Sequence, residues 1–524
     1  MYTRAGIDID LIPSFIKRVL VIAGSDSSGG AGLEADQRVL TAHGCYALTT
    51  TTALTAQNTL GVQDIHVVPA GFVRKQINAG LEDVGADVVK LGMLASAETA
   101  DMVADTLQHH KVSKVVLDPV MVSTSGSELL PAKAVNIVLT KLLPLTTIVT
   151  PNIPEAILLL QGSGAAAKDP ENLEDAIQIA KQIHTLGPKY VLLKGGHMPL
   201  TASFQRGTTA DQQPSKVVDV LYDGQEVTLF ENDFLTSKNT HGTGCSLASA
   251  IAANLAQGMD VVRAVRAACR FVEAGIRTSV DMGKGNGPIN HFHSVYSLPF
   301  APGRFVEYIL DRPDVQPLWK SFTEHEFVAG LGKGTLPVEK FKGYLIQDYH
   351  YLIHFARSNA LAASKHTDID GISMSAQIVL HVQREMNLHL DYCATFGLTK
   401  QDIENCKESL ACVAYSRYIL DIGQSEDWLA LQVALSPCLI GYGAIAKRLH
   451  CDENTALTGN RYWKWIENYV AEDYVKAVEA GSELLERHMR DVSPTRMEEL
   501  VKIFIRATEL EIGFWDMGLK ADQL

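Results

Sequence analysis

The chain has 524 residues, which is more than one hydrophobic core usually supports, so we expect two or three domains. Its 60 Asp and Glu residues outnumber its 46 Lys and Arg residues, and the formal net charge of −14 argues against a surface that binds nucleic acid or an anionic membrane. The eight cysteines are dispersed without a Cys-x-x-Cys pair, which disfavours a structural zinc site or a disulfide framework and fits a reducing compartment.

Residues 1–16 are predicted to form an N-terminal tail. The opening stretch MYTRAGIDIDLIPSFIKR carries acids among its apolar residues and has no apolar core of signal-peptide length. No uninterrupted apolar run in the chain is long enough to cross a bilayer. We therefore expect a cytoplasmic protein without a membrane partner.

Residues 17–297 alternate short β-branched runs with helical stretches such as 97–109 and 173–185. This alternation predicts parallel βαβ units, with helices on both faces of one sheet. Within 217–230, two strand-like runs flank Asp223-Gly224, a hairpin signal that predicts an antiparallel edge. Buried strands are expected at 18–23, 88–94, 114–121, 147–150 and 190–193.

The pattern changes at 298–303, where two prolines and a glycine (LPFAPG) predict a linker. In residues 304–524, apolar residues recur at three- and four-residue spacing and strand signals disappear, so we expect an all-α second domain. Amphipathic helices are expected at 338–364, 373–396, 399–424, 428–449 and 493–517.

A glycine-rich segment at 24–32 (GSDSSGGAG) follows the first strand and opens a helix. Part of it, Gly30-x-Gly32-x-x-Ala35, fits a dinucleotide-binding fingerprint. That motif needs an acid about 20 positions later to hold the ribose. Residues 45–57 contain no acid, so we disfavour this interpretation. Two Gly-Lys-Gly triplets, at 283–285 and 332–334, lack the full Walker A pattern and are interpreted as turns.

A stronger signal is KNTHGTGC at 238–245, which runs into an Ala-rich helix. Gly242 and Gly244 let backbone N–H groups converge at the start of that helix, where they form a partly positive pocket for a phosphate. Cys245 is expected at the same terminus, where the helix field lowers the pKa of a thiol and favours thiolate. The alternative is a helix cap with a buried structural cysteine.

Eight motifs in this order resemble the hydroxymethylpyrimidine/phosphomethylpyrimidine kinase family, which has the ribokinase-like α/β fold. The resemblance covers residues 17–295. The motifs are GSDSSGGAG, TAQNT at 55–59, KLGM at 90–93, DPVM at 118–121, TPNIPE at 150–155, LKGGH at 193–197, KNTHGTGC and GKGNGP at 283–288.

This resemblance implies ATP-dependent phosphorylation of 4-amino-5-hydroxymethyl-2-methylpyrimidine and of its monophosphate, with ATP and Mg²⁺ as cofactors. It implies that Gln57 holds the aminopyrimidine, with Met93 nearby, because an amide can pair with the ring amine and a ring nitrogen together. Cys245 stands where the wider superfamily has Asp, so it is either the base that takes the alcohol's proton, our hypothesis, or only part of the anion hole. The resemblance further implies that Asp118, Asn152 and Glu155 face Mg²⁺, and that Lys194, Gly242, Thr243 and Gly244 face the phosphates.

The helical half contains Ser436-Pro437-Cys438 within an apolar helix. A proline one turn in would bend that helix or mark its start, and a lone buried cysteine is usually structural. Tyr344, Asp348 and Tyr351 fall on one helical face, where an acid needs a partner. The Glu-x-x-His pairs of a ferritin-like di-iron site do not occur after the linker.

The motifs of this half resemble the thiaminase II (TenA) family, which has a haem-oxygenase-like helical fold, over about residues 303–522. They are GKGTLP at 332–337, YLIQDYHYL at 344–352, LSPC at 435–438 and Phe514-Trp515. The resemblance implies hydrolysis of thiamine or of aminopyrimidine breakdown products, with Cys438 as nucleophile and Glu511 exchanging a proton with the ring. It also implies that Asp348 binds the amino edge of the pyrimidine and that Tyr351, Tyr415 and Tyr469 line and orient the ring.

Both halves in this order resemble the fungal fusion of these two enzymes, in which one domain releases or salvages the pyrimidine and the other phosphorylates it. The resemblance implies a homo-oligomer, because such kinases commonly form dimers and TenA-like domains tetramers. Two alternatives stay open: a ribokinase-type kinase of a pyridoxal-like substrate or a sugar, against which Gln57 and Cys245 argue, and a helical domain that binds thiamine or serves assembly without catalysis. The preferred hydrolase substrate also stays open.

Overall fold

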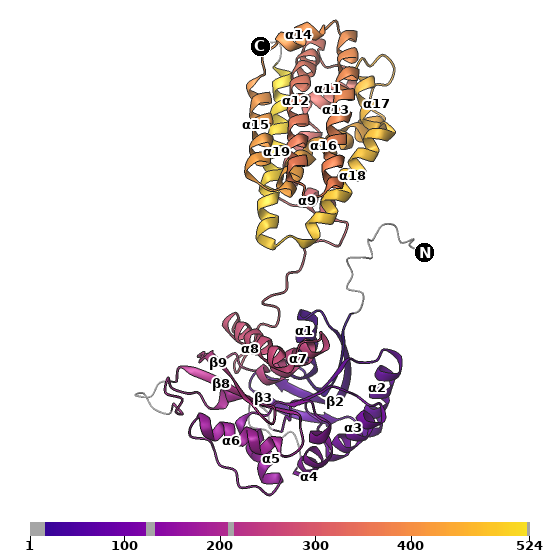
Figure 1. The fold of residues 1–524 in the computed structure, drawn as a ribbon. Coiled ribbons are helices and arrows are strands. Elements are labelled where there is room, and N and C mark those ends of the chain that lie inside the picture. Colours follow the sequence, from indigo (N-terminus) through magenta and orange to yellow (C-terminus); the bar gives the residue numbers. More distant parts are fainter. Residues whose placement is uncertain (1–15, 122–131, 208–213, 521–524) are drawn as a thin grey trace. The chain divides into compact units, whose positions relative to one another are not determined.

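The computed structural model describes residues 16–121, 132–207 and 214–520, and the chain divides between Val295 and Tyr296 into two compact units (Figure 1). The first unit is an α/β domain and the second is helical, as the sequence predicts. Of the expected N-terminal tail, only Ile16 lies within the described residues.

The first unit is built on one sheet of nine described strands. They are β1 (Arg18–Asp26), β2 (Tyr46–Asn58), β3 (Gly61–Val67), β4 (Val88–Leu91), β5 (Val115–Leu117), β6 (Ile148–Val149), β7 (Tyr190–Leu193), β8 (Lys216–Tyr222) and β9 (Val227–Asp233). Their order is β3-β2-β1-β4-β5-β6-β7-β8-β9. In the central part of this order, β2-β1-β4-β5-β6-β7, neighbouring strands run parallel. At the two edges, β3 pairs antiparallel with β2, β8 with β7, and β9 with β8.

Helices cover both faces of this sheet (Figure 1). In β1, Leu20 and Ile22 pack into the apolar cluster on one face, while Val19 and Val21 pack into the cluster on the other. A strand buried on both faces is apolar at successive positions, which explains the run RVLVIA. One face carries α2 (Ala70–Asp83), α3 (Ala97–His109), α4 (Ala132–Ile137), α5 (Ile153–Gly162) and α6 (Leu173–His184), and the other carries α1 (Gly32–Ala42), α7 (Thr243–Ala256) and α8 (Val261–Arg277).

Strands β2 and β3 were not predicted, because the threonine-rich segment 46–58 has no regular alternation of buried and exposed residues. The hairpin prediction at Asp223-Gly224 is confirmed by β8 and β9. There Gly224 adopts a φ of +97°, and an Asp223 carboxylate oxygen accepts hydrogen bonds from the backbone N–H groups of Gln225 and Glu226.

The second unit consists of helices with apolar side chains packed between them. They are α9 (Phe305–Asp311), α10 (Gln316–Thr323), α11 (Glu326–Lys333), α12 (Val338–Lys365), α13 (Ile369–Thr395), α14 (Lys400–Asn405), α15 (Leu410–Ser425), α16 (Trp428–Cys451), α17 (Trp463–Val470), α18 (Glu472–His488) and α19 (Pro494–Leu519). The expected linker, 298–303, falls within this unit, where Leu298 and Phe300 pack against its apolar core.

The prediction of a single helix over 399–424 is wrong. Cys406 is extended (ψ 136°) and ends α14, and Ser409 then starts α15 by accepting a hydrogen bond from the backbone N–H of Cys412. Serine is a favoured N-cap because its side chain satisfies a free amide at the helix start. The capping signal was therefore present inside an otherwise helical pattern.

Helix α16 runs through the middle of the bundle (Figure 1). Its length, and the mean hydropathy of 1.7 in its most apolar 18-residue segment, would suffice for a membrane span. However, 67% of that segment is buried within the protein, so core packing explains its apolar composition. Pro437 lies in the helix interior, so of its two expected roles, bending the helix or marking its start, the second is excluded. Because proline has no N–H for the carbonyl of Val433, that carbonyl accepts a hydrogen bond from the Ser436 hydroxyl at 2.8 Å instead.

Candidate active sites

A cavity of about 520 Å³ lies in the first unit, where the parallel strands reach their carboxyl ends. The segments that follow β1, β4, β5, β6 and β7 all contribute to it. The ten kinase-site residues expected from the sequence all line this one cavity: Gln57, Met93, Asp118, Asn152, Glu155, Lys194, Gly242, Thr243, Gly244 and Cys245.

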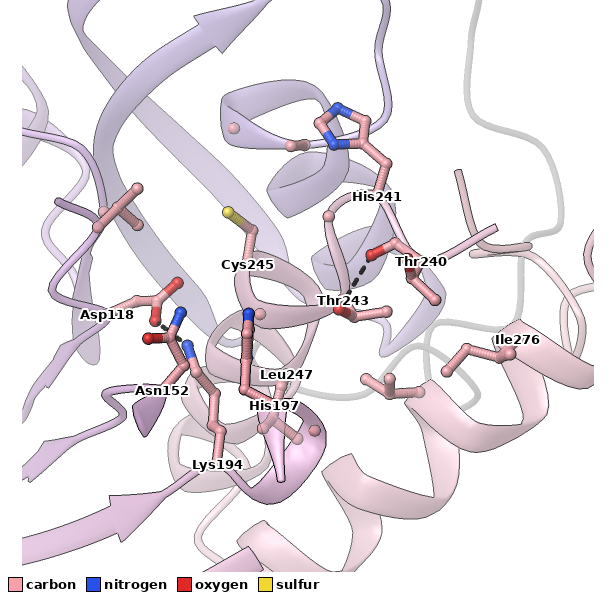
Figure 2. A pocket seen from close by; sticks show the side chains of 18 of the residues that line it. Asp118, Asn152, Lys194, His197, Thr240, His241, Thr243, Cys245, Leu247 and Ile276 are labelled. Atoms are coloured by element: carbon pink, nitrogen blue, oxygen red, sulfur yellow. Dashed lines mark hydrogen bonds and ion pairs between the residues drawn. The ribbon is translucent and has the colours of Figure 1, made fainter. Parts of the chain in front are cut away.

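The two glycine-rich loops contact each other beside this cavity. Gly242 has a φ of +81°, and a β-carbon there would lie 1.9 Å from the carbonyl oxygen of Gly30, so only glycine fits. Helix α7 begins directly after it at Thr243, whose hydroxyl donates to the carbonyl of Thr240 at 3.0 Å (Figure 2). The amides at the start of α7 are thus presented to the cavity, as an anion site requires.

Charged groups gather on the opposite side of the start of α7 (Figure 2). Lys194 Nζ lies 2.6 Å from Asp118 Oδ1 and 3.8 Å from Glu155 Oε2. Asn152 caps α5 and forms reciprocal hydrogen bonds with Glu155, each of 2.8 Å. Burial raises the pKa of Glu155 to about 7, although the positive charge of Lys194 acts against this rise.

These oxygen ligands fit a magnesium ion carried on a nucleotide. Asp118 and Glu155 supply carboxylate oxygens and Asn152 an amide oxygen, the ligand types that Mg²⁺ prefers together with water. The two carboxylates, of Asp118 and Glu155, share one ammonium, that of Lys194. When both are ionised, one negative charge is not neutralised, and a bound cation would neutralise it. The donor set therefore agrees with the expected Mg²⁺ site.

Cys245 lies in the first turn of α7 and its sulfur points into the cavity (Figure 2). Burial raises the pKa of its thiol to about 11, with the carboxylates of Asp36 and Asp118 adding to the rise and Lys90 opposing it. The expected lowering of this thiol pKa is therefore wrong, because burial is the largest influence on the thiol and acts in the opposite direction.

Two buried pairs of polar side chains beside the cavity were not predicted from the sequence. Asp26 accepts hydrogen bonds from four backbone or side-chain groups of its own loop, and from His241 Nε2 at 2.8 Å. His241 in turn lies 3.3 Å from the amide nitrogen of Gln57. The other pair joins Lys90 and Asp36. Their motifs were recognised, but only long-range contacts between β4, α1 and the two loops identify them as pairs.

The second unit gathers its expected site residues in its aromatic core. Tyr415 donates to Glu511 Oε1 at 2.7 Å, and its ring stacks on that of Tyr351 at 4.9 Å. Burial raises the pKa of Glu511 to about 8, although hydrogen bonds with Tyr415 and Cys438 act to lower it. Glu511 can therefore carry a proton at neutral pH and deliver it to a bound base.

Cys438 comes from α16 and is surrounded by this acid and by tyrosines. Burial raises the pKa of its thiol well above the usual value, and the negative charge of Glu511 raises it further. Thiolate is thus disfavoured until its proton has an acceptor. Glu511, which interacts with the thiol, can accept that proton once it has given its own proton to a bound base.

Asp348 lies on α12, and Tyr351 follows it on the same helical face. Burial raises the pKa of Asp348 to about 6, while His389, whose Nδ1 is 3.7 Å away, acts to lower it. The hydroxyl of Tyr351 is buried and has no hydrogen-bond partner among the described residues. A buried hydroxyl that is influenced by Cys438 and Glu511 and free to bond is what a site for a polar ring would provide.

Tyr469 lies on α17 and reaches the cluster through Tyr442, at a ring distance of 5.2 Å. The sequence analysis missed Tyr442 and His389. Tyr442 is four residues after Cys438 on one face of α16, so the helical spacing could have identified it. His389 lies on α13, and no sequence signal connects it with Asp348.

Comparisons with known proteins cover both units. Residues 26–290 match the phosphomethylpyrimidine kinase family model, and residues 312–521 match the TENA/THI-4/PQQC family model. A putative hydroxymethylpyrimidine/phosphomethylpyrimidine kinase of Schizosaccharomyces pombe is 43% identical over 95% of this chain and 90% of its own length. A hydroxymethylpyrimidine/phosphomethylpyrimidine kinase of Saccharomyces cerevisiae is 35% identical over 96% and 95%. A solved pyridoxal kinase of Bacillus subtilis in complex with ADP covers 53% of this chain and 98% of its own, with 32% identity and a TM-score of 0.46.

Proposed function

The chain belongs to the phosphomethylpyrimidine kinase family, with a C-terminal domain of the TENA/THI-4/PQQC family, and from this premise we propose a bifunctional enzyme. Its α/β domain phosphorylates 4-amino-5-hydroxymethyl-2-methylpyrimidine and then the monophosphate, using ATP. Its helical domain hydrolyses thiamine or related aminopyrimidines. The two activities supply and consume the same heterocycle for thiamine biosynthesis.

One observation supports the kinase assignment most strongly. A single cavity brings together a glycine-lined helix start, a lysine between two carboxylates, and a glutamine amide at its other side. Such a cavity can hold a triphosphate and a small polar heterocycle at once. Incubation with the hydroxymethylpyrimidine, ATP and Mg²⁺, with separation of mono- and diphosphate products, tests the proposal directly. Absence of both products with this substrate, but turnover of pyridoxal, would favour the alternative kinase.

We assign the steps of phosphoryl transfer to this chain's residues as follows. Gln57 and Met93 hold the pyrimidine, and Cys245 accepts the proton of its hydroxymethyl group. The alcohol oxygen bonds to the γ-phosphorus, the bond to the bridging oxygen breaks, and ADP leaves. Lys194 and the amides from Gly242 to Gly244 bind phosphate oxygens throughout.

Magnesium would be held by Asp118, Asn152 and Glu155, and when bound it offsets the negative charge of the phosphates. Lys194 already neutralises part of the charge of Asp118 and Glu155. A metal ion bound there would also keep Glu155 ionised, because its positive charge opposes the pKa rise that burial causes.

For the helical domain, we infer covalent catalysis by Cys438. The thiol sulfur adds to an electron-poor carbon of the pyrimidine, Glu511 delivers a proton to a ring nitrogen, and Glu511 takes up the thiol proton, so charge balances. The leaving group then departs from the ring's substituent, and water bonds to the carbon that it left. The bond between sulfur and ring carbon breaks as the thiol regains its proton, which restores the aromatic ring. Asp348 binds the amino edge of the ring, and Tyr351, Tyr415 and Tyr469 form the walls.

The alternative for this domain is thiamine binding without catalysis. Thiamine turnover by the full chain distinguishes the two, because a binding module would hold thiamine and release it unchanged. We further propose a cytoplasmic homo-oligomer, either dimer or tetramer. Light scattering and fractionation test these two points.

A further inference from the structure

Lys90 and Asp36 form an ion pair in the deepest part of the first unit. Lys90 comes from the central strand β4 and Asp36 from α1, and both side chains are 0% exposed. The ammonium nitrogen lies 2.9 and 2.8 Å from the two carboxylate oxygens. The Ser249 hydroxyl donates to the same carboxylate at 2.7 Å.

Stability does not explain this pair. Removing two charges from water costs several kcal/mol per ion, and apolar side chains of similar volume at such positions are often neutral or stabilising. The apolar cluster on this face of the sheet consists mainly of Val, Leu, Ala and Ile side chains, whose chemistry such a replacement would match. A role other than packing is therefore indicated.

The pair lies one helical turn beneath Cys245. Ser249 follows Cys245 by four residues on α7, so the two share one helix face, and Ser249 bonds to Asp36. Lys90 and Cys245 both line the cavity. Gly92, another lining residue, lies against the ammonium, because a β-carbon there would be 3.2 Å from Lys90 Nζ. An ammonium has three N–H donors. Among the described residues, the two carboxylate oxygens of Asp36 accept hydrogen bonds from the Lys90 ammonium.

Charged groups of both signs influence the sulfur of Cys245. The ammonium of Lys90 lowers the pKa of the thiol, whereas the carboxylates of Asp36 and Asp118 raise it. A hydrogen bond from the Gly32 backbone N–H also lowers it. Lys90 is therefore the positive side chain that most favours negative charge at the sulfur, and Lys194 interacts with the sulfur as well.

We propose that Lys90 is a positioning residue for phosphoryl transfer, whose ammonium, restrained by Asp36, stabilises negative charge on Cys245 while the sulfur accepts the proton of the substrate alcohol. Asp36 has the opposite electrostatic effect on the sulfur and serves to hold Lys90 in place. The proposal rests on the proposed kinase function, because the proton it concerns is that of the hydroxymethyl group.

Alkylation of the full chain by iodoacetamide at a fixed pH tests the electrostatic part without any substrate. Mass spectrometry of the peptide that contains Cys245 gives its rate separately from that of Cys438. Lys90→Met should slow alkylation of Cys245 by about tenfold, and Asp36→Asn should accelerate it, since one pKa unit changes the thiolate fraction by a factor of ten. The rate at Cys438 should stay unchanged and serves as the internal control. Slower alkylation in both variants would mean a merely structural pair and would overturn the proposal.

The double variant Lys90→Met/Asp36→Leu guards against misfolding, because it leaves no unpaired buried charge. Its kcat for pyrimidine phosphorylation should fall about tenfold or more while both KM values stay within about threefold, as loss of an interaction made only in the transition state requires. A normal kcat in a folded double variant would refute the role of Lys90. If the wild-type chain phosphorylated no pyrimidine but the opposite alkylation effects persisted, the proposed function would fail while the electrostatic role of Lys90 stood.

Discussion

The two units each present a cysteine to a candidate active site, and the surroundings of these cysteines differ in kind. Cys245 lies at a helix start, in a cavity that holds two lysines and the glycine-lined anion site. Cys438 lies in the interior of a helix, among tyrosines and two carboxyl groups, those of Glu511 and Asp348. Burial raises the pKa of both thiols.

This contrast shows that a cysteine's role depends on where its proton can go. Near Cys245, fixed cations can stabilise a thiolate, so the sulfur can act as a base towards an alcohol. Near Cys438 there is no such cation among the groups that influence it, and a carboxyl group with a raised pKa can pass a proton between thiol and substrate. We expect the two sites to respond differently to the same substitutions.

The largest effect is expected from Cys438→Ala. Because the attacking atom is removed, hydrolysis of thiamine and aminopyrimidines should fall by at least about 10³-fold, while kinase activity stays near wild type. Steady-state assays of both reactions on one preparation measure this. Cys412→Ala, at another buried cysteine of the same domain, is the matched control. Full hydrolase activity in Cys438→Ala would leave the TENA-type domain as a binding or assembly module.

Cys245→Ser is expected to slow phosphoryl transfer by about 10²–10⁴-fold, the usual effect of losing a general base, because a serine hydroxyl ionises far less readily than a thiol. KM for ATP and for the pyrimidine should change little, since serine keeps the shape of the site. Initial rates across both substrate concentrations separate kcat from KM. Cys45→Ser, outside the cavity, is the control. A nearly normal kcat would reduce Cys245 to part of the anion hole.

Gln57→Leu should raise KM for the pyrimidine by about 10- to 100-fold and leave KM for ATP unchanged. A substrate group left unpaired in a buried site costs about 1–3 kcal/mol. Gln76→Leu removes an amide that bonds only to the Thr51 backbone of the neighbouring strand, and it should leave both KM values unchanged. An unaltered pyrimidine KM in Gln57→Leu would remove this residue from the binding site.

Much of the secondary structure could be predicted because it depends on residues that are close together in the sequence. Apolar runs and glycine-rich loops identified the parallel strands and the site segments that follow them, and helical spacing identified most of α12, α13, α16 and α19. The pairs Asp26–His241, Lys90–Asp36 and Asp348–His389 escaped because each joins distant segments. The raised thiol pKa values escaped for the same reason, since burial depends on the whole domain.

Glu511 should make the stability of the helical domain depend on pH. Its pKa is about 8 in the folded chain, whereas an ordinary glutamate has a pKa of 4.5. Between these values the folded state holds a proton that the unfolded state has released, so stability falls as pH rises. Glu511→Gln should flatten this dependence between pH 6.5 and 8 and shift the melting temperature at pH 8 upward by roughly a few degrees.

All five tryptophans lie between residues 319 and 515, so their fluorescence reports unfolding of the helical domain alone. Glu511→Gln should also retain substrate while hydrolysing it slowly, because the amide keeps the shape and loses proton exchange. An unchanged pH dependence in this variant would mean that Glu511 is ionised in the folded chain, contrary to the proton delivery assigned to it.

The smallest effect is expected from cutting the chain between its two units. Each of the fragments 17–295 and 296–524 contains its own apolar clusters and a full set of proposed site residues. A domain with its own core can fold alone, so each fragment should keep its activity within about twofold of the full chain.

The cut at 295/296 is preferable to one inside 298–303, because Leu298 and Phe300 pack against the helical core, and the ring of Phe300 lies 5.4 Å from that of Phe305. A second helical fragment that starts at Gly303 therefore provides a matched comparison, and it should melt at a lower temperature than 296–524. If 296–524 does not fold, or if either activity requires the other fragment to be present, the two sites are not independent and the contrast between Cys245 and Cys438 cannot be attributed to their local surroundings.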